Sequence, residues 1–296
     1  MKLSEDPDLH PILFGLFLSM YLVTVLGNLL IILAVISSDS HLHTPMYFFL
    51  SNLSFVDICF TSTTVPKMIV DILTQCNVIS YVGCLTQMSL LIVFGCMDDL
   101  LLTVMAYDRF VAICHPLHYP VIMSPQLCIF LVFACVLLSL LDLQLHTLIV
   151  LKFTYFKDVS VSNFCCEPAQ ILNLDCTENL NKNIIIYVVG TMFGFFPILV
   201  ILLSYYKIIS TILRVPSSGG KYKAFSTCGS HLSVVCLFYG TSVGMYLGSA
   251  IVHSPQKILA SSVMYTVVTP TLNPFIYSLR NRDIKDALRK LHRRKV

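Results

Sequence analysis

Ionisable side chains lie in the middle of long apolar stretches of this 296-residue sequence. Asp57 falls in one stretch, and Asp98 and Asp99 fall in the next, while the amides of Asn28 and Asn273 lie at a matching depth in the first and last stretches. A carboxylate at the depth of a bilayer is costly, so it is a functional candidate by default. Two neighbouring carboxylates need a shared proton or a cation. We therefore interpret Asp57 and Asp98 as a candidate cation site, with sodium as its ion.

A second ionisable pair, Asp142 and His146, lies in another apolar stretch. Their spacing of four residues puts both side chains on the same face of a helix. Such a pair is more often a satisfied polar contact in the packing between helices than a ligand site. We favour that structural interpretation here.

Enzymatic patterns in the sequence do not have the context that their chemistry needs. Gly240-Thr-Ser-Val-Gly244 matches the G-x-S-x-G pattern of a nucleophile elbow, which would suggest an intramembrane hydrolase. That elbow requires a strand, a turn and a helix, whereas this pattern lies within an apolar stretch. A transporter, the other alternative, would show repeated halves, and no repeat is visible. We expect no enzymatic activity, no cofactor apart from the candidate sodium ion and no nucleic-acid partner.

The composition fits a membrane protein, because 56% of the residues are apolar and only 12% are charged. Seven apolar runs are long enough to cross about 30 Å of hydrocarbon. We expect an all-α fold, a bundle of seven transmembrane helices over residues 12–279. The predicted spans are approximately 12–36, 46–73, 83–113, 126–151, 183–213, 224–247 and 258–279.

Basic residues orient the predicted bundle. Eight of the 19 lysines and arginines lie between Arg280 and Lys295, which indicates that this end is cytoplasmic. An odd number of spans then places residues 1–11 outside. Within 280–296, Ile284, Ala287 and Leu288 share one face, which predicts a short amphipathic helix on the inner leaflet, ahead of a basic tail.

Several motifs at the predicted helix ends are specific. Met105-Ala-Tyr-Asp-Arg-Phe-Val-Ala-Ile-Cys114 ends the third span, and Asn273-Pro-Phe-Ile-Tyr277 lies near the end of the seventh. These resemble the Asp-Arg-Tyr and Asn-Pro-x-x-Tyr motifs of rhodopsin-like (class A) G-protein-coupled receptors. Three further stretches narrow the resemblance to odorant receptors: Leu42-His-Thr-Pro-Met-Tyr47, Lys223-Ala-Phe-Ser-Thr-Cys228 followed by Ser230-His231-Leu232, and Pro274 to Arg280.

The resemblance implies a multi-pass plasma-membrane receptor that binds small, mostly apolar volatiles and activates a stimulatory olfactory heterotrimeric G protein, which raises cyclic AMP. It also implies a two-state switch in which Arg109 pairs with Asp108 at rest and turns toward Tyr205, Tyr277 and the G protein on activation. The predicted switch residues are Asp108, Arg109, Tyr205, Asn273, Pro274 and Tyr277.

The expected ligand pocket lies in the outer half of the bundle, between the third, fifth, sixth and seventh spans. Counting helical turns outward from Arg109 identifies its wall on the third span, and residues spaced by three and four identify the wall on the sixth. No charged residue among them would pair with an amine, so a biogenic amine is not expected. The predicted lining residues are Leu91, Ile92, Gly95, Cys96, Val189, Phe193, Tyr239, Val243, Tyr246 and Thr266.

The sequence departs from the family pattern at several positions. The resemblance pairs Cys84 with Cys166 in a disulfide, but Phe156 stands where the long outer loop usually has another cysteine, so Cys165 with Cys176 is only a weaker second pairing. Asp98 stands where the family more often has Glu. Residues 1–11 contain no Asn-x-Ser/Thr glycosylation signal, which leaves a truncated receptor-like chain that traffics poorly as an alternative.

Overall fold

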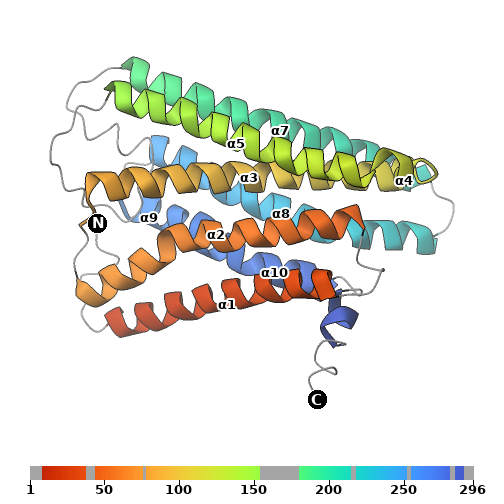
Figure 1. Cartoon of the computed structure of the whole chain (residues 1–296), viewed down its shortest axis with the longest axis horizontal. Coiled ribbons are helices and arrows are strands. Elements are labelled where there is room, and N and C mark those ends of the chain that lie inside the picture. The colour runs from red at the N-terminus through yellow and green to blue at the C-terminus, as the bar shows by residue number, and fades with distance from the viewer. Residues whose placement is uncertain are drawn as a thin grey trace.

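Five long apolar helices form the framework of a helix bundle in the computed structural model (Figure 1). Each contains a stretch that is long and apolar enough to cross a bilayer, by length and composition. The structure describes residues 9–37, 44–75, 78–153, 180–214, 218–251, 255–280 and 284–289. The five helices are α1 (His10–Ser37), α2 (Pro45–Thr74), α3 (Tyr81–Cys114), α5 (Pro125–Phe153) and α7 (Leu180–Arg214).

The rest of the described bundle consists of α8 and a broken helical run. The run comprises α9, a π-helical turn η3 and α10, and a short helix, α4, follows α3. Their bounds are α8 (Ser218–Ile251), α9 (Pro255–Val263), η3 (Met264–Val268), α10 (Thr269–Arg280) and α4 (Tyr119–Ile122). Each of the seven predicted spans coincides with one long helix or with this run. The sequence did not predict the π turn.

The π turn lies just before a proline in the last crossing. Pro270 has no main-chain N–H, so the hydrogen-bond ladder cannot continue regularly through it. The hydroxyl of Thr269 donates to the carbonyl oxygen of Met264 over 3.0 Å, and the Thr269 N–H bonds the same carbonyl. A proline in this crossing is therefore accommodated by a wider turn and a side-chain hydroxyl, as helices in lipid require.

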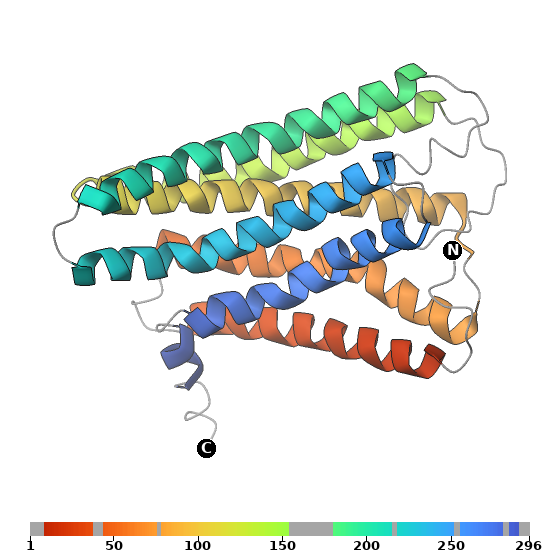
Figure 2. The ribbon, with the colours of Figure 1, turned by 180° about the vertical axis from the view of Figure 1, so that it is seen from behind.

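Helix α3 lies in the middle of the bundle, with α2 on one side and α5 and α7 on the other (Figures 1 and 2). The largest cluster of buried apolar residues centres on its inner half, where Leu101, Leu102 and Met105 meet side chains of the neighbouring helices. We call the end at which α3 finishes, at Cys114, the inner end. A smaller cluster, with Cys84, Met88 and Val150, joins α3 to α5 near the other, outer end.

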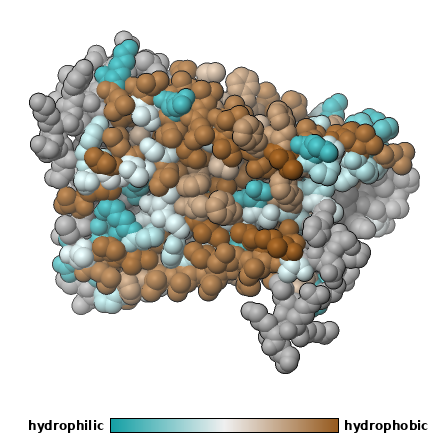
Figure 3. All heavy atoms as spheres, viewed as in Figure 1, coloured by the Kyte–Doolittle hydropathy of each residue, from teal (hydrophilic) through white to brown (hydrophobic). Residues whose placement is uncertain are grey.

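Apolar side chains cover most of the face shown in Figure 3, and hydrophilic residues are more frequent toward its two ends. Leu26 on α1 and Leu148 on α5 are examples of large exposed apolar residues. A soluble protein avoids an apolar exterior of this extent, whereas lipid chains cover it without cost. The exterior therefore matches that of a multi-pass membrane protein.

Residues 284–289 form a helical turn at the inner end of the bundle, which is the end away from the start of α1 (Figure 1). Ile284 and Ala287 are buried against the large core cluster, and Leu288 packs at its edge. Lys285 and Asp286, on the other face, are exposed. The turn is therefore amphipathic, with the face that the sequence predicts.

A glycine brings α1 close to α10. A Cβ atom added at Gly27 would lie 3.0 Å from the Cβ of Pro274 and 3.2 Å from its Cγ. Beside this contact, the hydroxyls of Thr24 and Thr271 are hydrogen-bonded at 2.8 Å. Small residues permit such close approach between helices in membranes.

We predict that Gly27→Val destabilises the bundle by about 1–3 kcal/mol, the usual cost of overpacking, because its added carbons would displace the rigid ring of Pro274. Gly15→Val is the matched control, because Gly15 lies on the same helix with nothing within 4 Å of an added Cβ. Thermal unfolding of both purified variants in detergent measures the difference. Equal midpoints would show that the contact between α1 and α10 does not contribute to stability.

Candidate functional site

A buried carboxylate on α2 is bonded to an amide on α10. The Nδ2 of Asn273 donates to both oxygens of Asp57, over 3.0 and 3.1 Å. Asp98 on α3 is buried within electrostatic reach of Asp57, and its Oδ1 has no hydrogen-bond partner. Oxygen atoms of this kind are the ligands that hard cations prefer. The sodium site stays a prediction, since the described residues contain no cluster of three His, Cys, Asp or Glu side chains that could hold a metal ion.

Asn28 does not join this group of residues. Its Nδ2 donates to the carbonyl oxygen of Thr24, one turn earlier on α1, over 3.1 Å. Its Oδ1 is buried and has no hydrogen-bond partner. Asn28 and Asp57 thus lie at a matching depth, but no hydrogen bond joins their side chains, since Asp57 bonds Asn273.

Arg109 is buried at the inner end of α3 with its Nη2 unpartnered. The expected resting pair with Asp108 is not formed, since no ion pair between these two described residues lies within 4.0 Å. Asp108 instead accepts a hydrogen bond from the hydroxyl of Tyr119 on α4, over 2.8 Å. Neighbouring side chains in α3 point in different directions around the helix, which explains why sequence adjacency does not bring these charges together.

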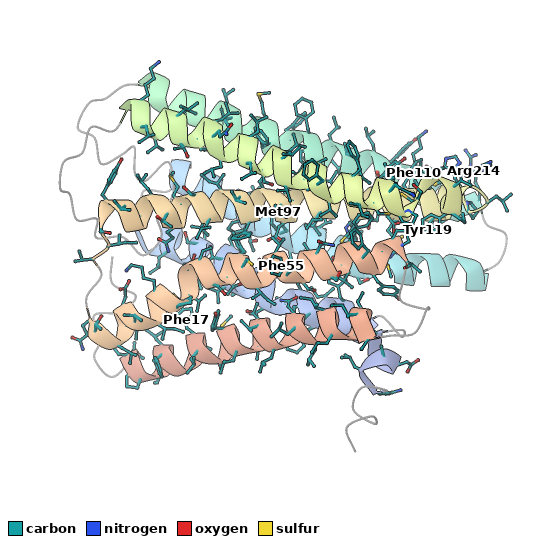
Figure 4. The ribbon with its side chains drawn as sticks, in the orientation of Figure 1. Phe17, Phe55, Met97, Phe110, Tyr119 and Arg214 are labelled. Atoms are coloured by element: carbon teal, nitrogen blue, oxygen red, sulfur yellow. The ribbon has the colours of Figure 1, made fainter. Side chains whose placement is uncertain are left out.

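Tyr119, on the short helix α4 that follows α3, is held as a hydrogen-bond donor. Burial, reinforced by the charge of Asp108, raises the pKa of its phenol above the usual value. The hydroxyl therefore stays protonated through the physiological range and can only donate to the carboxylate. Figure 4 shows Tyr119 and Phe110 together at the inner end.

A histidine connects three helices near Arg109. The hydroxyl of Tyr205 on α7 lies 2.6 Å from Nδ1 of His231 on α8, and the two rings are stacked. Nε2 of the same histidine lies 3.1 Å from the carbonyl oxygen of Leu102 on α3. Since a carbonyl can only accept, Nε2 carries a proton, and in a neutral ring Nδ1 then accepts from the Tyr205 hydroxyl. The ring thus ties α3, α7 and α8 together.

Tyr277 is buried beside this group, on α10, and its hydroxyl has no hydrogen-bond partner. It lies within electrostatic reach of Arg109 and Tyr205. The structure therefore gathers Arg109, Tyr205 and Tyr277 in one region of the inner half, while their role as a switch stays a prediction. Asn273 lies one turn away on α10, where it bonds Asp57.

A hydrogen bond joins α3 to α8 at the boundary between the outer and inner halves of the bundle. The hydroxyl of Tyr239 donates to Oδ1 of Asp99, which is buried. An intramolecular hydrogen bond contributes about 0.5–1.5 kcal/mol to stability. Tyr239 therefore fixes α8 against α3 at the inner limit of the predicted pocket.

Gly95 makes room for an aromatic residue of the π turn. An added Cβ at Gly95 would lie 3.1 Å from the hydroxyl oxygen of Tyr265 and 3.5 Å from Phe60. The Tyr265 ring packs edge-on against Phe60, at 5.3 Å between centroids, and beside Phe238 at 5.6 Å. These rings fill the space between α2, α3 and α8 below the outer half.

The other predicted pocket residues are distributed over the expected helices. Leu91 packs against the cluster of α1, α2 and η3, whereas Ile92 packs against the α3–α5 cluster. Thr266 is buried, but its hydroxyl donates to the carbonyl oxygen of Ser262 over 2.8 Å. Val243 is exposed, and Val189 and Phe193 are partly buried. The Tyr246 side chain lies outside the described residues. These assignments stay predictions.

The sequence did not single out Tyr119 or Tyr265 as site residues, and it assigned no role to His231. His231 belongs to a quoted motif, so its presence was noted, but its bonds to two other helices depend on packing. Tyr119 could have been found as a hydroxyl in the loop directly after the Asp108 motif. Tyr265 gave no signal, because its position depends on the π turn.

Cys84 is disulfide-bonded, and it is buried at the outer end of α3. Cys166, its predicted partner, lies outside the described residues, as do Cys165 and Cys176. The pairing of Cys84 with Cys166 stays a prediction. Cys59, Cys96, Cys114, Cys128, Cys135, Cys228 and Cys236 are free.

Comparison with known proteins gives consistent matches along the chain. A family model described as olfactory receptor matches residues 17–295. Human olfactory receptor 7E24 is 69% identical over 294 residues, which cover 99% of this chain and 86% of that protein. Mouse olfactory receptor 7E178 is 67% identical over 296 residues, covering 100% and 89%. Human olfactory receptor 7D4 is 61% identical over 291 residues, covering 98% and 93%.

We predict that Asp57→Asn and Asp98→Asn each remove a sodium-specific stabilisation of the purified protein. A ligand that binds only the folded state adds about 1.4 kcal/mol at ten times its dissociation constant. The unfolding midpoint is compared in sodium chloride and in choline chloride at equal ionic strength. Asp71→Asn is the control, because Asp71 on α2 pairs instead with Lys67 over 2.5 Å. Retention of the sodium effect in both variants would refute the site.

A second prediction concerns the disulfide. Proteolysis without reduction, followed by mass spectrometry, should recover the peptide of Cys84 joined to that of Cys166. The bridge would fix the long outer loop over the outer end of α3, which is why its geometry matters for ligand entry. Recovery of Cys84 joined to Cys176, or of a free Cys84, would contradict the pairing.

Proposed function

The chain belongs to the olfactory receptor family of G-protein-coupled receptors, and from this membership we propose that it binds a small, mostly apolar volatile in the outer half of its bundle and activates a stimulatory heterotrimeric G protein at the inner end. The G protein would raise cyclic AMP. The protein is a multi-pass membrane receptor for odorants. We further propose that it acts in the plasma membrane, with residues 1–11 outside and 280–296 in the cytoplasm.

One observation supports the G-protein end of this proposal more than any other. Arg109 is buried at the inner end with an unpartnered nitrogen, although leaving a charged group without partners is costly. Asp108, its neighbour, is bonded by Tyr119 and does not neutralise it directly. A planar guanidinium suits several hydrogen-bond acceptors at once. Arg109 is therefore positioned to form new bonds when the inner end opens.

The bonds at the inner end suggest how it opens. The link from Leu102 through His231 to Tyr205 joins α3, α8 and α7. Outward movement of α8 would break it and release the hydroxyl of Tyr205 toward Arg109. Tyr277, whose hydroxyl has no partner, is near enough to contribute to the same group. The switch would then exchange one set of hydrogen bonds for another between two discrete states.

The pocket would act on this switch through the bond between Asp99 and Tyr239. A ligand among the predicted lining residues lies directly outward of that bond, since Cys96 is three residues before Asp99 on α3. A ligand that favours one position of Tyr239 shifts the equilibrium of α8 only by its difference in affinity for the two states. A sodium ion held by Asp57 and Asp98 would favour whichever state keeps both carboxylates together.

We predict that Arg109→Ala abolishes odorant-stimulated cyclic AMP while leaving odorant binding nearly intact. Leu91, the outermost predicted pocket residue of α3, lies 18 positions away, or about 27 Å at 1.5 Å per residue, so Arg109 cannot touch the ligand. A modest loss of affinity is still expected, because coupling between two binding sites is reciprocal. The measurement compares reporter output with ligand occupancy, both corrected for surface expression.

Arg214→Ala is the matched control, since it removes an exposed arginine from the inner end of α7. It should retain the cyclic AMP response. A full response from Arg109→Ala would reject the assigned role of this residue. Loss of the response in both variants would mean that total charge at the inner end, and not Arg109, determines coupling.

A further inference from the structure

Helix α8 is joined to the last crossing at two neighbouring points, where it lies beside the π turn (Figure 2). The ring of Phe238 packs beside that of Tyr265 in η3, with 5.6 Å between centroids. Three residues further along α8, the hydroxyl oxygen of Thr241 lies 3.0 Å from that of Thr269, the first residue of α10. The ring contact has little directionality, so the hydroxyl pair is the directional part of this joint.

Each hydroxyl of this pair also has an acceptor on its own helix. The Thr241 hydroxyl lies 2.8 Å from the carbonyl oxygen of Leu237, one turn earlier on α8. The Thr269 hydroxyl lies 3.0 Å from the carbonyl oxygen of Met264. A hydroxyl has one proton to donate and can also accept, whereas a carbonyl only accepts. One of the two protons therefore forms the bond between the helices, and the other bonds the main chain of its own helix.

Separation of α8 from α10 at this joint leaves neither hydroxyl without a partner. Each would donate to the carbonyl oxygen on its own helix, and the Met264 carbonyl also keeps the main-chain N–H of Thr269. Separation of α10 from α2 is different, because Asp57 would lose both of its hydrogen bonds from Asn273. A buried polar group that loses its partner is costly. The joint between α8 and α10 is therefore one that opens at low cost.

We propose that the hydroxyl pair of Thr241 and Thr269 is a conformational latch, which holds α8 against the π turn in the present conformation and lets it go when α8 moves outward. The proposal rests on the outward movement of α8 proposed above, and it adds the element that limits this movement when no ligand is bound. The closed state has one hydrogen bond between the helices that the open state lacks. The balance between the two states therefore depends on both hydroxyls.

The test measures opening of the inner end without a G protein. Cys228 on α8 is free and buried, so its alkylation by N-ethylmaleimide reports outward movement of that helix. Mass spectrometry follows the alkylation rate in purified, ligand-free wild type, Thr241→Val, Thr269→Val and the double variant. Ser242→Ala is the matched control, because this neighbouring hydroxyl donates to the carbonyl oxygen of Tyr239 on its own helix. Basal cyclic AMP, corrected for surface expression, is measured in parallel.

Thr241→Val and Thr269→Val should each raise the Cys228 alkylation rate by about two- to tenfold, the population change that loss of one hydrogen bond produces. The double variant should show the same rise as either single variant, since all three lack the same bond. Ser242→Ala, and Thr269→Ser, which keeps the hydroxyl, should match the wild type.

Three results would overturn the latch: an unchanged alkylation rate in either valine variant, a multiplied rise in the double variant, or an equal rise in Ser242→Ala. Failure of the proposed function gives a different pattern. A raised alkylation rate without raised basal cyclic AMP would support the latch and contradict coupling to a stimulatory G protein.

Discussion

Polar groups inside a bilayer have no water to bind, and this constraint shapes each part of the bundle. The main chain meets it by forming helices, and buried side chains meet it by bonding to their own helix or to other helices. The amide of Asn273 bonds Asp57 across α10 and α2, and Tyr239 bonds Asp99 across α8 and α3. Helices that share an apolar surface with lipid gain little by packing together, so such polar bonds fix their relative positions. The order of the bundle depends on them.

The few buried polar atoms without partners are informative for the same reason. Within the described residues they include Oδ1 of Asp98, Oδ1 of Asp142, Nη2 of Arg109 and the hydroxyl of Tyr277. These atoms are spread along the bundle from the outer half to the inner end. Oδ1 of Asp98 belongs to the proposed cation site, and Nη2 of Arg109 and the Tyr277 hydroxyl belong to the proposed signalling end. A receptor needs some bonds that are incomplete in one state, since only these can differ between states.

Much of this architecture follows from the sequence because its physical cause is local. Span length depends on apolar runs, and the seven predicted segments lie within helical segments of the structure. Motif residues Arg109, Tyr205 and Tyr277 gather at the inner end, since each occupies the same depth on its own helix. The sequence could not predict contacts that depend on helix rotation. Asp108 turns toward Tyr119, and Asn28 bonds its own helix, although depth alone suggested other partners.

The π turn in the last crossing has a consequence for how this kind of protein can diversify. One extra residue in a turn corresponds to about 100° of rotation around a helix axis, given 3.6 residues per turn. The wide turn at Met264–Val268 therefore separates the angular setting of α9 from that of α10. Substitutions, or even a one-residue change in length, on the outer side can alter which side chains face an odorant without rotating Asn273, Pro274 and Tyr277. Evolution can in this way vary what is recognised and keep the signalling end constant.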